Sequence, residues 1–285
     1  MRPERIAAAF KWACLAELDA PKPGNVHVFA AGHRMTADEF VASAEAAAAP
    51  LSAEGTRVGT RILGAVEATF AAIGANTNLG IILLCAPLAA AADAGTSDLR
   101  TLLINVLQAL DTEDAELAFR AIVRAAPAGL GHSMRHDVFE PATVSLLQAM
   151  TEAADRDRVA RQYATIFADV FDLGLPLLEA AIRQHVNLKW ATLATYLGFL
   201  SAFPDSHILR KCGAQTAEEV RRTAATFQAS LSVTKHPVQI LPELLDWDAE
   251  LKAHGINPGT SADLTVATLF AQRLQIILPS ERNGG

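Results

Sequence analysis

The sequence has few cysteines, and none of them stands at the spacing of a metal site. Its three cysteines, Cys14, Cys85 and Cys212, lie far apart, each in an apolar or helical context. They are therefore predicted to be reduced thiols of the protein core, and a cysteine metal site is not expected.

A long hydrophobic run is also missing. The longest, from Ile81 to Ala92, contains Pro87 and is well short of the roughly 20 residues that a membrane-spanning helix needs. Near the N-terminus, charged residues alternate with apolar ones, unlike the unbroken apolar core of a secretory signal. We therefore expect no membrane segment and a cytoplasmic location.

Basic clusters are absent as well. The formal net charge is −7, and no run of lysines and arginines offers an electrostatic surface to nucleic acid or to an anionic membrane. The sequence also lacks a P-loop, an H-E-x-x-H motif, a G-x-S-x-G motif and the protein-kinase signatures. A nucleotide, if bound, must be held by a different kind of binding motif.

What the sequence does have is a surplus of apolar residues: 51% of its 285 residues are hydrophobic and only 19% are charged. A chain of this length can bury a large core, and we expect a single domain over residues 1–285. The apolar surplus would suit the interface of a homodimer. The other expected partners are small molecules.

Apolar residues recur at helical spacing along most of the chain, whereas the alternation typical of strands is nearly absent. Abundant alanine and short Gly and Pro interruptions also favour an all-α fold of ten or more helices. The segment 79–92 is apolar all round, which predicts a central buried helix. The other predicted helices are 4–18, 36–49, 60–73, 97–109, 112–125, 140–154, 156–172, 175–186, 188–202, 216–231, 240–253 and 261–277.

Four polar loops interrupt these apolar helices. They read PKPGNVHVFAAGHRM (21–35), GANTNLG (74–80), FPDSHILRKCG (203–213) and HGINPGTSADL (254–264). All four carry side chains suited to binding phosphate, hydroxyl groups or a metal, and binding residues tend to collect in loops on a rigid scaffold.

In the loop 74–80, Asn76, Thr77 and Asn78 directly precede the buried helix. Their side chains and the first N–H groups of that helix are suited to a phosphate. The structural alternative is an ordinary helix N-cap, which needs only one such residue.

In the loop 254–264, Asn257, Pro258 and Gly259 form a predicted turn. Thr260 is the expected N-cap of the following helix, with Asp263 as its capping-box partner. Capping alone would explain both residues. If Asp263 instead holds a magnesium ion, it does so through one carboxylate together with waters and substrate phosphates.

In the loop 21–35, Lys22 stands between two prolines that restrict the backbone, an arrangement that suits phosphate binding. The alternative is a solvated surface lysine. His27 and His33 are candidate acid–base groups, although a single loop histidine is more often a hydrogen-bonded structural residue.

In the loop 203–213, Asp205, Ser206 and His207, followed by Arg210 and Lys211, are able to contact a metal, ribose hydroxyls or phosphate. Here the alternative is a helix cap after a proline. A fifth segment, GLGHSMRHD (129–137), begins like a dinucleotide fingerprint but lacks the third glycine and a preceding strand, so His132 and Asp137 are only weak candidates.

At these loops the sequence resembles the triphosphoribosyl-dephospho-coenzyme A synthase family, which makes a prosthetic-group precursor for citrate lyase and malonate decarboxylase. The resemblance follows the order of motifs over nearly the whole chain. Its segments are Pro21-Lys22-Pro23-Gly24, Gly32-His33, Glu67, Asn76-Thr77-Asn78-Leu79-Gly80, Asp205-Ser206-His207 and Asn257-Pro258-Gly259-Thr260-Ser261-Ala262-Asp263-Leu264.

The resemblance implies an all-helical, magnesium-using, ATP-binding transferase. Such an enzyme joins the triphosphoribosyl part of ATP to the 2′-hydroxyl of dephospho-coenzyme A and releases adenine. One departure is that Asn78 and Leu79 stand where the synthases carry His and Lys. The chain therefore looks closer to the family members of archaea and methylotrophic bacteria.

The resemblance also implies the roles of individual residues. Asp205, Asp263 or Glu67 would hold the metal or take the proton of the acceptor hydroxyl, and His33 would protonate adenine. The expected catalytic residues are thus His33, Glu67, Asp205 and Asp263, and the expected metal ligands are Asp205 and Asp263. The expected nucleotide-binding and phosphate-binding residues are Lys22, Pro23, Gly24, Asn25, Asn76, Thr77, Asn78, Gly80, Ser206, His207, Asn257, Gly259 and Thr260.

Two alternative functions remain. The altered loop 74–80 suggests an ATP-dependent transferase acting on a different cofactor precursor, for example in a methanopterin-type or methanofuran-type pathway. The apolar surplus suggests a non-catalytic helical scaffold or nucleotide sensor. Analysis of the products formed from ATP tests the first alternative, because free adenine indicates glycosyl transfer whereas ADP, AMP or pyrophosphate indicates another reaction. Calorimetry with ATP and magnesium tests the second, because a scaffold would give no heat of binding.

Overall fold

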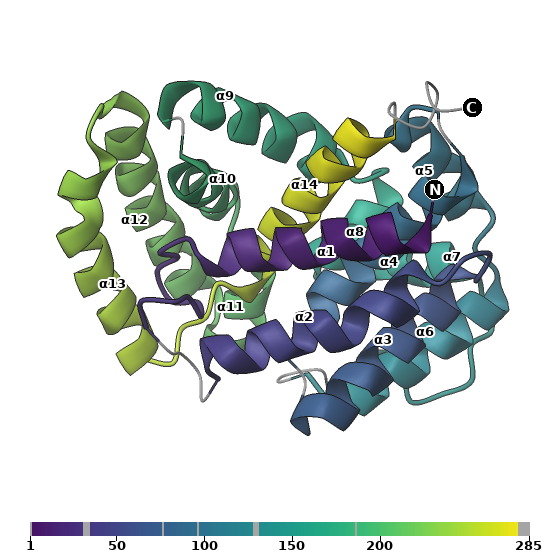
Figure 1. Ribbon diagram of the computed structural model, residues 1–285. Coiled ribbons are helices and arrows are strands. Elements are labelled where there is room, and N and C mark those ends of the chain that lie inside the picture. Colours follow the sequence, from purple (N-terminus) through teal and green to yellow (C-terminus); the bar gives the residue numbers. More distant parts are fainter. Residues whose placement is uncertain are drawn as a thin grey trace. The chain divides into compact units, whose positions relative to one another are not determined.

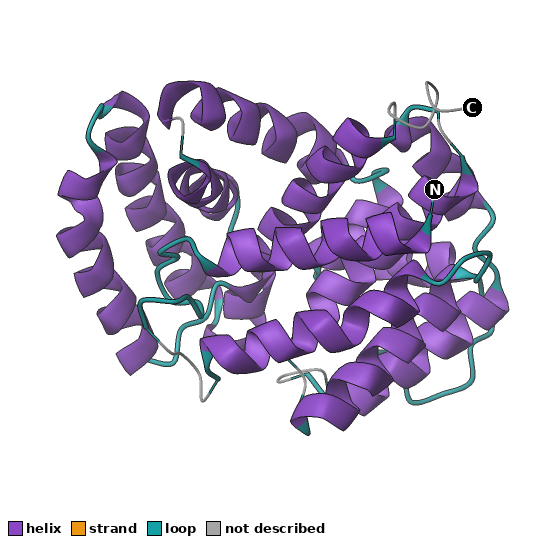
Figure 2. Cartoon of the chain, in the orientation of Figure 1, coloured by secondary structure: helices purple, strands orange, loops and turns teal. Residues whose placement is uncertain are grey.

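The computed structural model describes residues 2–30, 35–75, 77–95, 97–127, 131–185 and 187–278. Every regular element in these ranges is a helix, as Figure 2 shows. The all-α prediction is therefore confirmed.

The chain forms two compact units, each assembled from separate segments. Unit 1 consists of Met1–Ala13, Val41–Ala168 and Phe270–Gly285, and unit 2 consists of Cys14–Phe40 and Asp169–Leu269. Three helices, α1 (Pro3–Leu18), α2 (Ala37–Ser52) and α14 (Gly259–Ile277), contribute residues to both units. The single domain over residues 1–285 stays a prediction.

Unit 1 is built around α4 (Leu79–Ala94), which packs against α3 (Val58–Ile73), α5 (Leu99–Gln108) and α8 (Arg158–Ala164). Most of the α4 side chains are buried, which confirms the predicted buried helix. Pro87 lies inside α4 and has no N–H to donate to the carbonyl oxygen of Leu83. The hydroxyl of Tyr163 donates to that oxygen instead, at 2.6 Å. Unit 1 also contains α6 (Thr112–Ala125) and α7 (Leu146–Ala153).

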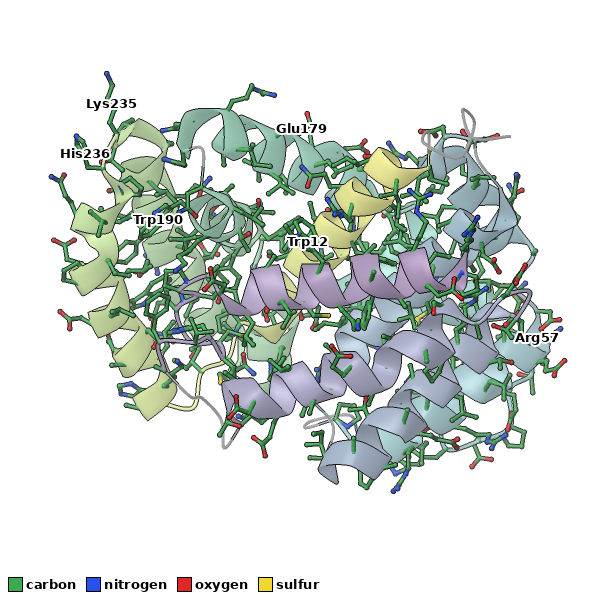
Figure 3. The ribbon with its side chains drawn as sticks, viewed as in Figure 1. Trp12, Arg57, Glu179, Trp190, Lys235 and His236 are labelled. Atoms are coloured by element: carbon green, nitrogen blue, oxygen red, sulfur yellow. The ribbon has the colours of Figure 1, made fainter. Side chains whose placement is uncertain are left out.

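The C-terminal part of α14 packs along α1 in unit 1, and Figure 3 labels Trp12 of α1 at this contact. The rings of Phe10 and Phe270 meet edge to face at 5.9 Å, and the guanidinium of Arg273 lies over the ring of Trp12. This contact joins two segments at opposite ends of the sequence.

Unit 2 is built around α10 (Leu188–Ala202), which packs against α9 (Leu175–His185) and α12 (Ala214–Val233), as Figure 1 shows. Phe227 of α12 stacks on Trp247 of α13 (Leu241–Ala253) at 5.1 Å between ring centroids. In Figure 3, Lys235 and His236 point away from the helices at the turn between α12 and α13. The remaining elements are a π-helix (η1, Asp169–Gly174), α11 (Ser206–Cys212) and a 3₁₀-helix (η2, Pro237–Ile240).

Local capping signals in the sequence are present in the structure. The hydroxyl of Thr36 accepts the N–H of Glu39, and the Glu39 carboxylate accepts the N–H of Thr36, so the expected motif forms at the start of α2. Gly74 ends α3 in the left-handed region, with φ 75°, and donates to the carbonyl of Phe70.

Three predicted helices and one predicted loop differ from the structure. The helix predicted at 36–49 continues through Pro50 to Ser52, whose hydroxyl donates to the carbonyl of Ala48. The helix predicted at 140–154 begins only at Leu146, because Ser145 and Gln148 cap it there. The helix predicted at 156–172 is interrupted at Ile166 and Phe167, which both have φ 54°, before η1 begins. The loop predicted at 203–213 is largely the helix α11.

Among the described residues, no single helix is long and apolar enough to cross a membrane; only α4 and α5 together, bent by 108°, pass a test of length and composition. None of the three cysteines forms a disulfide; Cys85 is buried, and Cys14 and Cys212 are partly buried.

Candidate functional site

Three of the four predicted loops meet within unit 2. The side-chain amide of Asn25 donates to the side-chain oxygen of Asn257 at 2.9 Å. The N–H and the hydroxyl of Ser261 both donate to one oxygen of Asp205, each at 2.8 Å. The hydroxyl of Thr260 accepts the N–H of His207 at 3.2 Å. We call residues 22–27, 205–207 and 257–261 the loop cluster.

Gly24 determines how closely two of these loops approach. Its φ is +78°, and a Cβ at this position would lie 2.8 Å from Cδ of Pro258 and 3.1 Å from the carbonyl oxygen of Ile256. Any other residue would therefore be strained at this backbone angle and would push the two loops apart.

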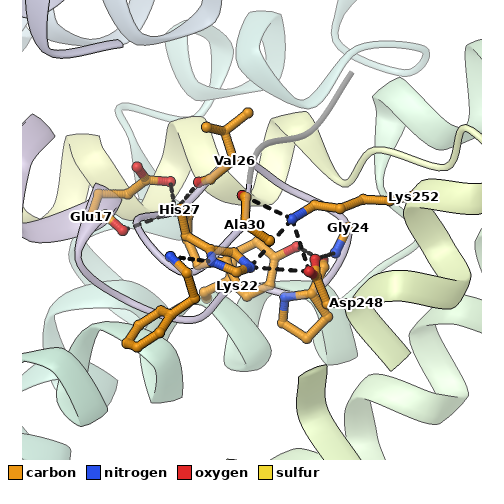
Figure 4. A network of polar contacts seen from close by, with 11 residues as sticks. Glu17, Lys22, Gly24, Val26, His27, Ala30, Asp248 and Lys252 are labelled. Carbon is orange, nitrogen blue, oxygen red and sulfur yellow. Dashed lines mark hydrogen bonds and ion pairs between the residues drawn. The ribbon is translucent and has the colours of Figure 1, made fainter. Parts of the chain in front are cut away.

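A buried network on α13 holds the first loop, and Figure 4 shows its contacts. Asp248 accepts hydrogen bonds from the N–H of Gly24 at 2.8 Å and from the ammonium of Lys252 at 2.8 Å. Nε2 of His27 lies 3.3 Å from the same carboxylate, and Lys252 also donates to the carbonyl of Ala30. Asp248 is only 3% exposed, so one carboxylate anchors the loop inside the unit.

The hydrogen bonds of His27 indicate which ring nitrogen carries the proton. Nδ1 accepts the N–H of Phe29 at 3.3 Å, which assigns the proton of the neutral ring to Nε2. Nε2 lies 3.3 Å from Asp248, the acceptor for that proton, and 3.4 Å from the ammonium of Lys252. Burial lowers the pKa of His27 more than the nearby Asp248 raises it. His27 is therefore neutral near pH 7 and has a structural role, one of the two alternatives that its sequence position left open.

Lys22 is fully buried, contrary to the exposed lysine that a phosphate-binding role requires. Its ammonium donates to the carbonyl oxygens of Glu17 and Val26, at 2.9 and 2.7 Å, and pairs with the Glu17 carboxylate at 3.1 Å. Burial lowers the pKa of Lys22 and raises that of Glu17, while each charge opposes the shift of the other. Direct phosphate binding would require the ammonium to leave all three partners, so the structure favours a loop-bracing role.

Pro23 is held through its backbone. The hydroxyl of the buried Tyr196, on α10, donates to the Pro23 carbonyl oxygen at 2.7 Å. The loop from Pro21 to His27 is thus attached to α1 through Glu17, to α10 through Tyr196 and to α13 through Asp248.

Asp205 is the N-cap of α11, which confirms the helix cap that the sequence left open as the alternative for this segment. One carboxylate oxygen accepts the N–H groups of His207 and Ile208, and the other accepts both donors of Ser261. Burial raises the pKa of Asp205, and these four hydrogen bonds oppose the shift. Both oxygens are therefore engaged inside the protein, which leaves no coordination position for the metal that the resemblance assigned to Asp205.

The capping box expected at Thr260 and Asp263 is wrong, because α14 already begins at Gly259 and Thr260 lies in its first turn. Gly259, the first residue of α14, leaves space for a neighbouring side chain. A Cβ there would lie 2.8 Å from Nδ1 of His207, so the glycine makes room for the imidazole. Ser206, the first residue of α11, is buried.

The fourth loop, 74–80, belongs to unit 1. The hydroxyls of Thr77 and Ser43 are 2.5 Å apart, and Asn78 is buried at the start of α4 without a side-chain cap. Gly80 lies in the first turn of α4, and Asn76 is outside the described residues. The phosphate-binding role of this loop stays a prediction.

Two of the expected catalytic residues, Glu67 and His33, are not part of the loop cluster. Glu67 is exposed on α3 of unit 1 and lines a cavity of about 520 Å³ together with side chains of α6 and residues 138–141. His33 is outside the described residues. The weak candidates His132 and Asp137 form a hydrogen bond with each other at 2.9 Å, and His132 is largely exposed.

The described residues contain no preformed metal cage: no three His, Cys, Asp or Glu side chains are grouped to hold an ion. Magnesium that arrives with a nucleotide needs only one or two protein carboxylates besides phosphates and water. Asp263, partly exposed one turn into α14, fits that limited requirement, whereas Asp205 does not.

Glu17, Tyr196, Asp248 and Lys252 are site residues that the sequence analysis missed. A carboxylate and a lysine four residues apart on a helix are usually a surface pair, so the spacing of Asp248 and Lys252 gave no sign of burial. Asp248 and Lys252 were recognised as site residues only because the fold places the loop of Gly24 against them.

Comparisons with known proteins agree with the sequence resemblance. The profile of a family described as ATP:dephospho-CoA triphosphoribosyl transferase matches residues 3–281. A crystal structure from Archaeoglobus fulgidus, described as a candidate triphosphoribosyl-dephospho-CoA synthase, has 25% sequence identity and a TM-score of 0.65. The match covers 83% of this chain and 99% of that protein. No individual curated protein matches the chain.

Proposed function

The chain belongs to the ATP:dephospho-CoA triphosphoribosyl transferase family, and we propose that the loop cluster of unit 2 holds the ATP in this reaction. The protein is thus a transferase that moves the triphosphoribosyl group of ATP to dephospho-CoA. The observation that carries the proposal is the hydrogen bond between Asn25 and Asn257, which joins two of the loops expected to bind nucleotide.

The amide pair has polar groups left for a ligand. A carboxamide has two donors and an oxygen acceptor, and the bond between the two side chains uses one donor and one acceptor position. In either orientation of the two amides, one NH₂ group and one carbonyl oxygen remain. Asn257 is partly exposed, so its remaining groups are able to contact a phosphate or a ribose hydroxyl.

The reaction itself forms one bond and breaks another at the same carbon. The 2′-hydroxyl oxygen of dephospho-CoA bonds to C1′ of the ATP ribose, the C1′–N9 bond breaks, and the hydroxyl proton is balanced by protonation of the departing adenine. Positive charge develops on the ribose, so fixed polar groups that hold the ribose and triphosphate in place lower the barrier. Bound magnesium would neutralise phosphate charge, with Asp263 as its candidate ligand.

Lys22 is left out of the phosphate-binding set, because its ammonium is buried and is bound to two oxygens of Glu17 on α1 and to the carbonyl of Val26. Lys211 is a better placed cation: it is exposed on α11, and its ammonium donates to the carbonyl of Gly255, two residues before Asn257. His207 and Thr260 complete the proposed nucleotide contacts, with Asn25 and Asn257.

The test is a change of charge without a change of shape. Asn257→Asp keeps the oxygen that accepts from Asn25 but adds a negative charge, so we expect KM for ATP to rise about tenfold or more through repulsion of the triphosphate. Asn187→Asp in the same unit is the matched control, because Asn187 caps α10 through its side-chain oxygen and Asp caps equally well. An unchanged KM in Asn257→Asp would contradict the proposal.

Product analysis is the accompanying experiment. Incubation of the protein with ATP, magnesium and dephospho-CoA should release free adenine. ADP or AMP would instead indicate phosphoryl or adenylyl transfer to another acceptor, the alternative that the altered loop 74–80 suggests. The cytoplasmic location, the homodimer and the lack of nucleic-acid or membrane partners stay predictions.

A further inference from the structure

Asp248 is a buried carboxylate of unit 2 that receives donors both from its own helix and from the loop that carries Asn25. Its first oxygen accepts the N–H of Gly24 at 2.8 Å, across 224 residues of sequence. Its second oxygen lies 2.8 Å from the ammonium of Lys252 and 3.3 Å from Nε2 of His27. Figure 4 shows these contacts converging on the one side chain.

We propose that Asp248 is a positioning residue of the transferase, fixing the loop from Pro21 to His27 so that Asn25 meets Asn257. This inference rests on the proposed function, because it concerns the loop that carries Asn25. Asp248 itself is 3% exposed and is bound on both oxygens, so it acts through the loop and not on the substrate.

The path from Asp248 to the amide pair is short and tightly packed. Gly24 is followed directly by Asn25, and the space around the Gly24 α-carbon is closed by Cδ of Pro258, which follows Asn257. A shift of the Gly24 backbone therefore moves both members of the amide pair. Rigid, close-packed contacts transmit such shifts because they leave no space to absorb them.

His27 provides the second point of attachment. Its Nδ1 is occupied by the N–H of Phe29, so the Nε2 proton is directed at Asp248. A neutral donor and an anionic acceptor form a charge-assisted hydrogen bond. The remaining charge of the carboxylate is balanced by Lys252, which is also held by the carbonyl of Ala30.

Replacement of the carboxylate by an amide tests this arrangement. Asp248→Asn keeps an oxygen for the N–H of Gly24 but turns an NH₂ group toward two other donors, His27 and Lys252. The loop should then shift by a fraction of an ångström to about one ångström, and a misplacement of that size costs up to about 100-fold in rate. We expect kcat to fall about 10- to 100-fold, while KM for ATP changes less than about threefold.

A double variant separates positioning from simple folding. Adding His27→Gln to Asp248→Asn supplies a side-chain oxygen that accepts from the new amide, so the loop is attached again, and kcat should recover several-fold. The control is Asp246→Asn, which makes the same change at an exposed position of the same helix and should leave kcat unchanged. Thermal unfolding of each variant shows whether the assay temperature lies below its transition.

The wild-type protein provides a readout that does not depend on any variant folding. The ¹⁵N resonances of the His27 ring should show a neutral ring with its proton on Nε2, and the Gly24 amide should exchange slowly. An Nδ1-protonated ring, an unchanged kcat in folded Asp248→Asn, or a kcat loss without recovery in the double variant would overturn the proposal. Failure of Asn257→Asp to alter KM would refute the ATP site alone, because the Asp248 measurements concern kcat and the loop.

Discussion

Asp205 and Ser261 are joined by two hydrogen bonds of 2.8 Å to one carboxylate oxygen, although they lie 56 residues apart in the sequence. The same carboxylate caps α11 with its other oxygen. One buried side chain therefore fixes the beginnings of two helices, α11 and α14, beside the proposed nucleotide site.

Asp205→Ala should destabilise the protein by roughly 2 to 4 kcal/mol, because it removes a cap and leaves buried donors of Ser261 unpaired. Asp98→Ala is the matched control: Asp98 caps α5 by accepting from Thr101, without a second helix attached. It should cost only about 1 kcal/mol. If urea unfolding gave the same loss of unfolding free energy for Asp205→Ala and Asp98→Ala, the contact with Ser261 would contribute nothing to stability.

Gly24→Ala should cost more than the same change at Gly55. Both glycines have positive φ, +78° and +65°, so both variants carry a backbone strain of about 1 kcal/mol. Only at Gly24 does the new methyl group meet other atoms, since nothing lies within 4 Å of that position at Gly55. Denaturant unfolding gives the difference, and adenine release should fall for Gly24→Ala alone.

Gly259→Ala should reduce activity with little effect on stability. The added methyl group would lie 2.8 Å from Nδ1 of His207, and a side chain moves aside more easily than backbone. We expect a loss of stability of about 1 kcal/mol or less and a clear rise of KM for ATP. Gly95→Ala is the control, because its nearest contact is an ordinary 3.4 Å to Leu102. A KM that does not change would remove His207 from the proposed ATP site.

His27 should make the protein less stable in mild acid. Burial lowers its pKa in the folded state, so the unfolded chain, with a pKa near 6.5, binds the proton more readily. The stability of the neutral form is complete above about pH 6.5 and declines as the pH falls through the interval down to the folded pKa.

The measurement is urea unfolding of the wild type and of His27→Gln between pH 5 and pH 8. The variant keeps a donor toward Asp248 but does not titrate, so the wild type should lose stability relative to it as the pH falls. The raised pKa values of Glu17 and Asp205 act in the opposite direction in both proteins and cancel in the difference. A difference that is independent of pH would contradict the neutral His27.

The sequence by itself determined the helices and the order of the polar loops. Helical spacing of apolar residues is a local property, so it predicted α4 and most other helices, and the Thr36–Glu39 and Gly74 signals depend only on neighbouring residues. The family could likewise be inferred from the motif order, because motifs such as Asn257-Pro258-Gly259 are written along the chain. Local patterns failed where the backbone is unusual, as at Ile166 and Phe167.

Only the tertiary structure decided which polar residues are exposed and which are buried with hydrogen-bond partners inside the protein. Lys22 and Asp205 belong to residue types that bind phosphate and metal, yet each is buried and fully hydrogen-bonded. Asp248 and Lys252 have the spacing of a surface pair, yet they anchor the loop of Gly24. The physical reason is that burial and hydrogen-bond partners depend on how the folded segments pack, as between Gly24 and Asp248, 224 residues apart, and these contacts decide whether a charge is available.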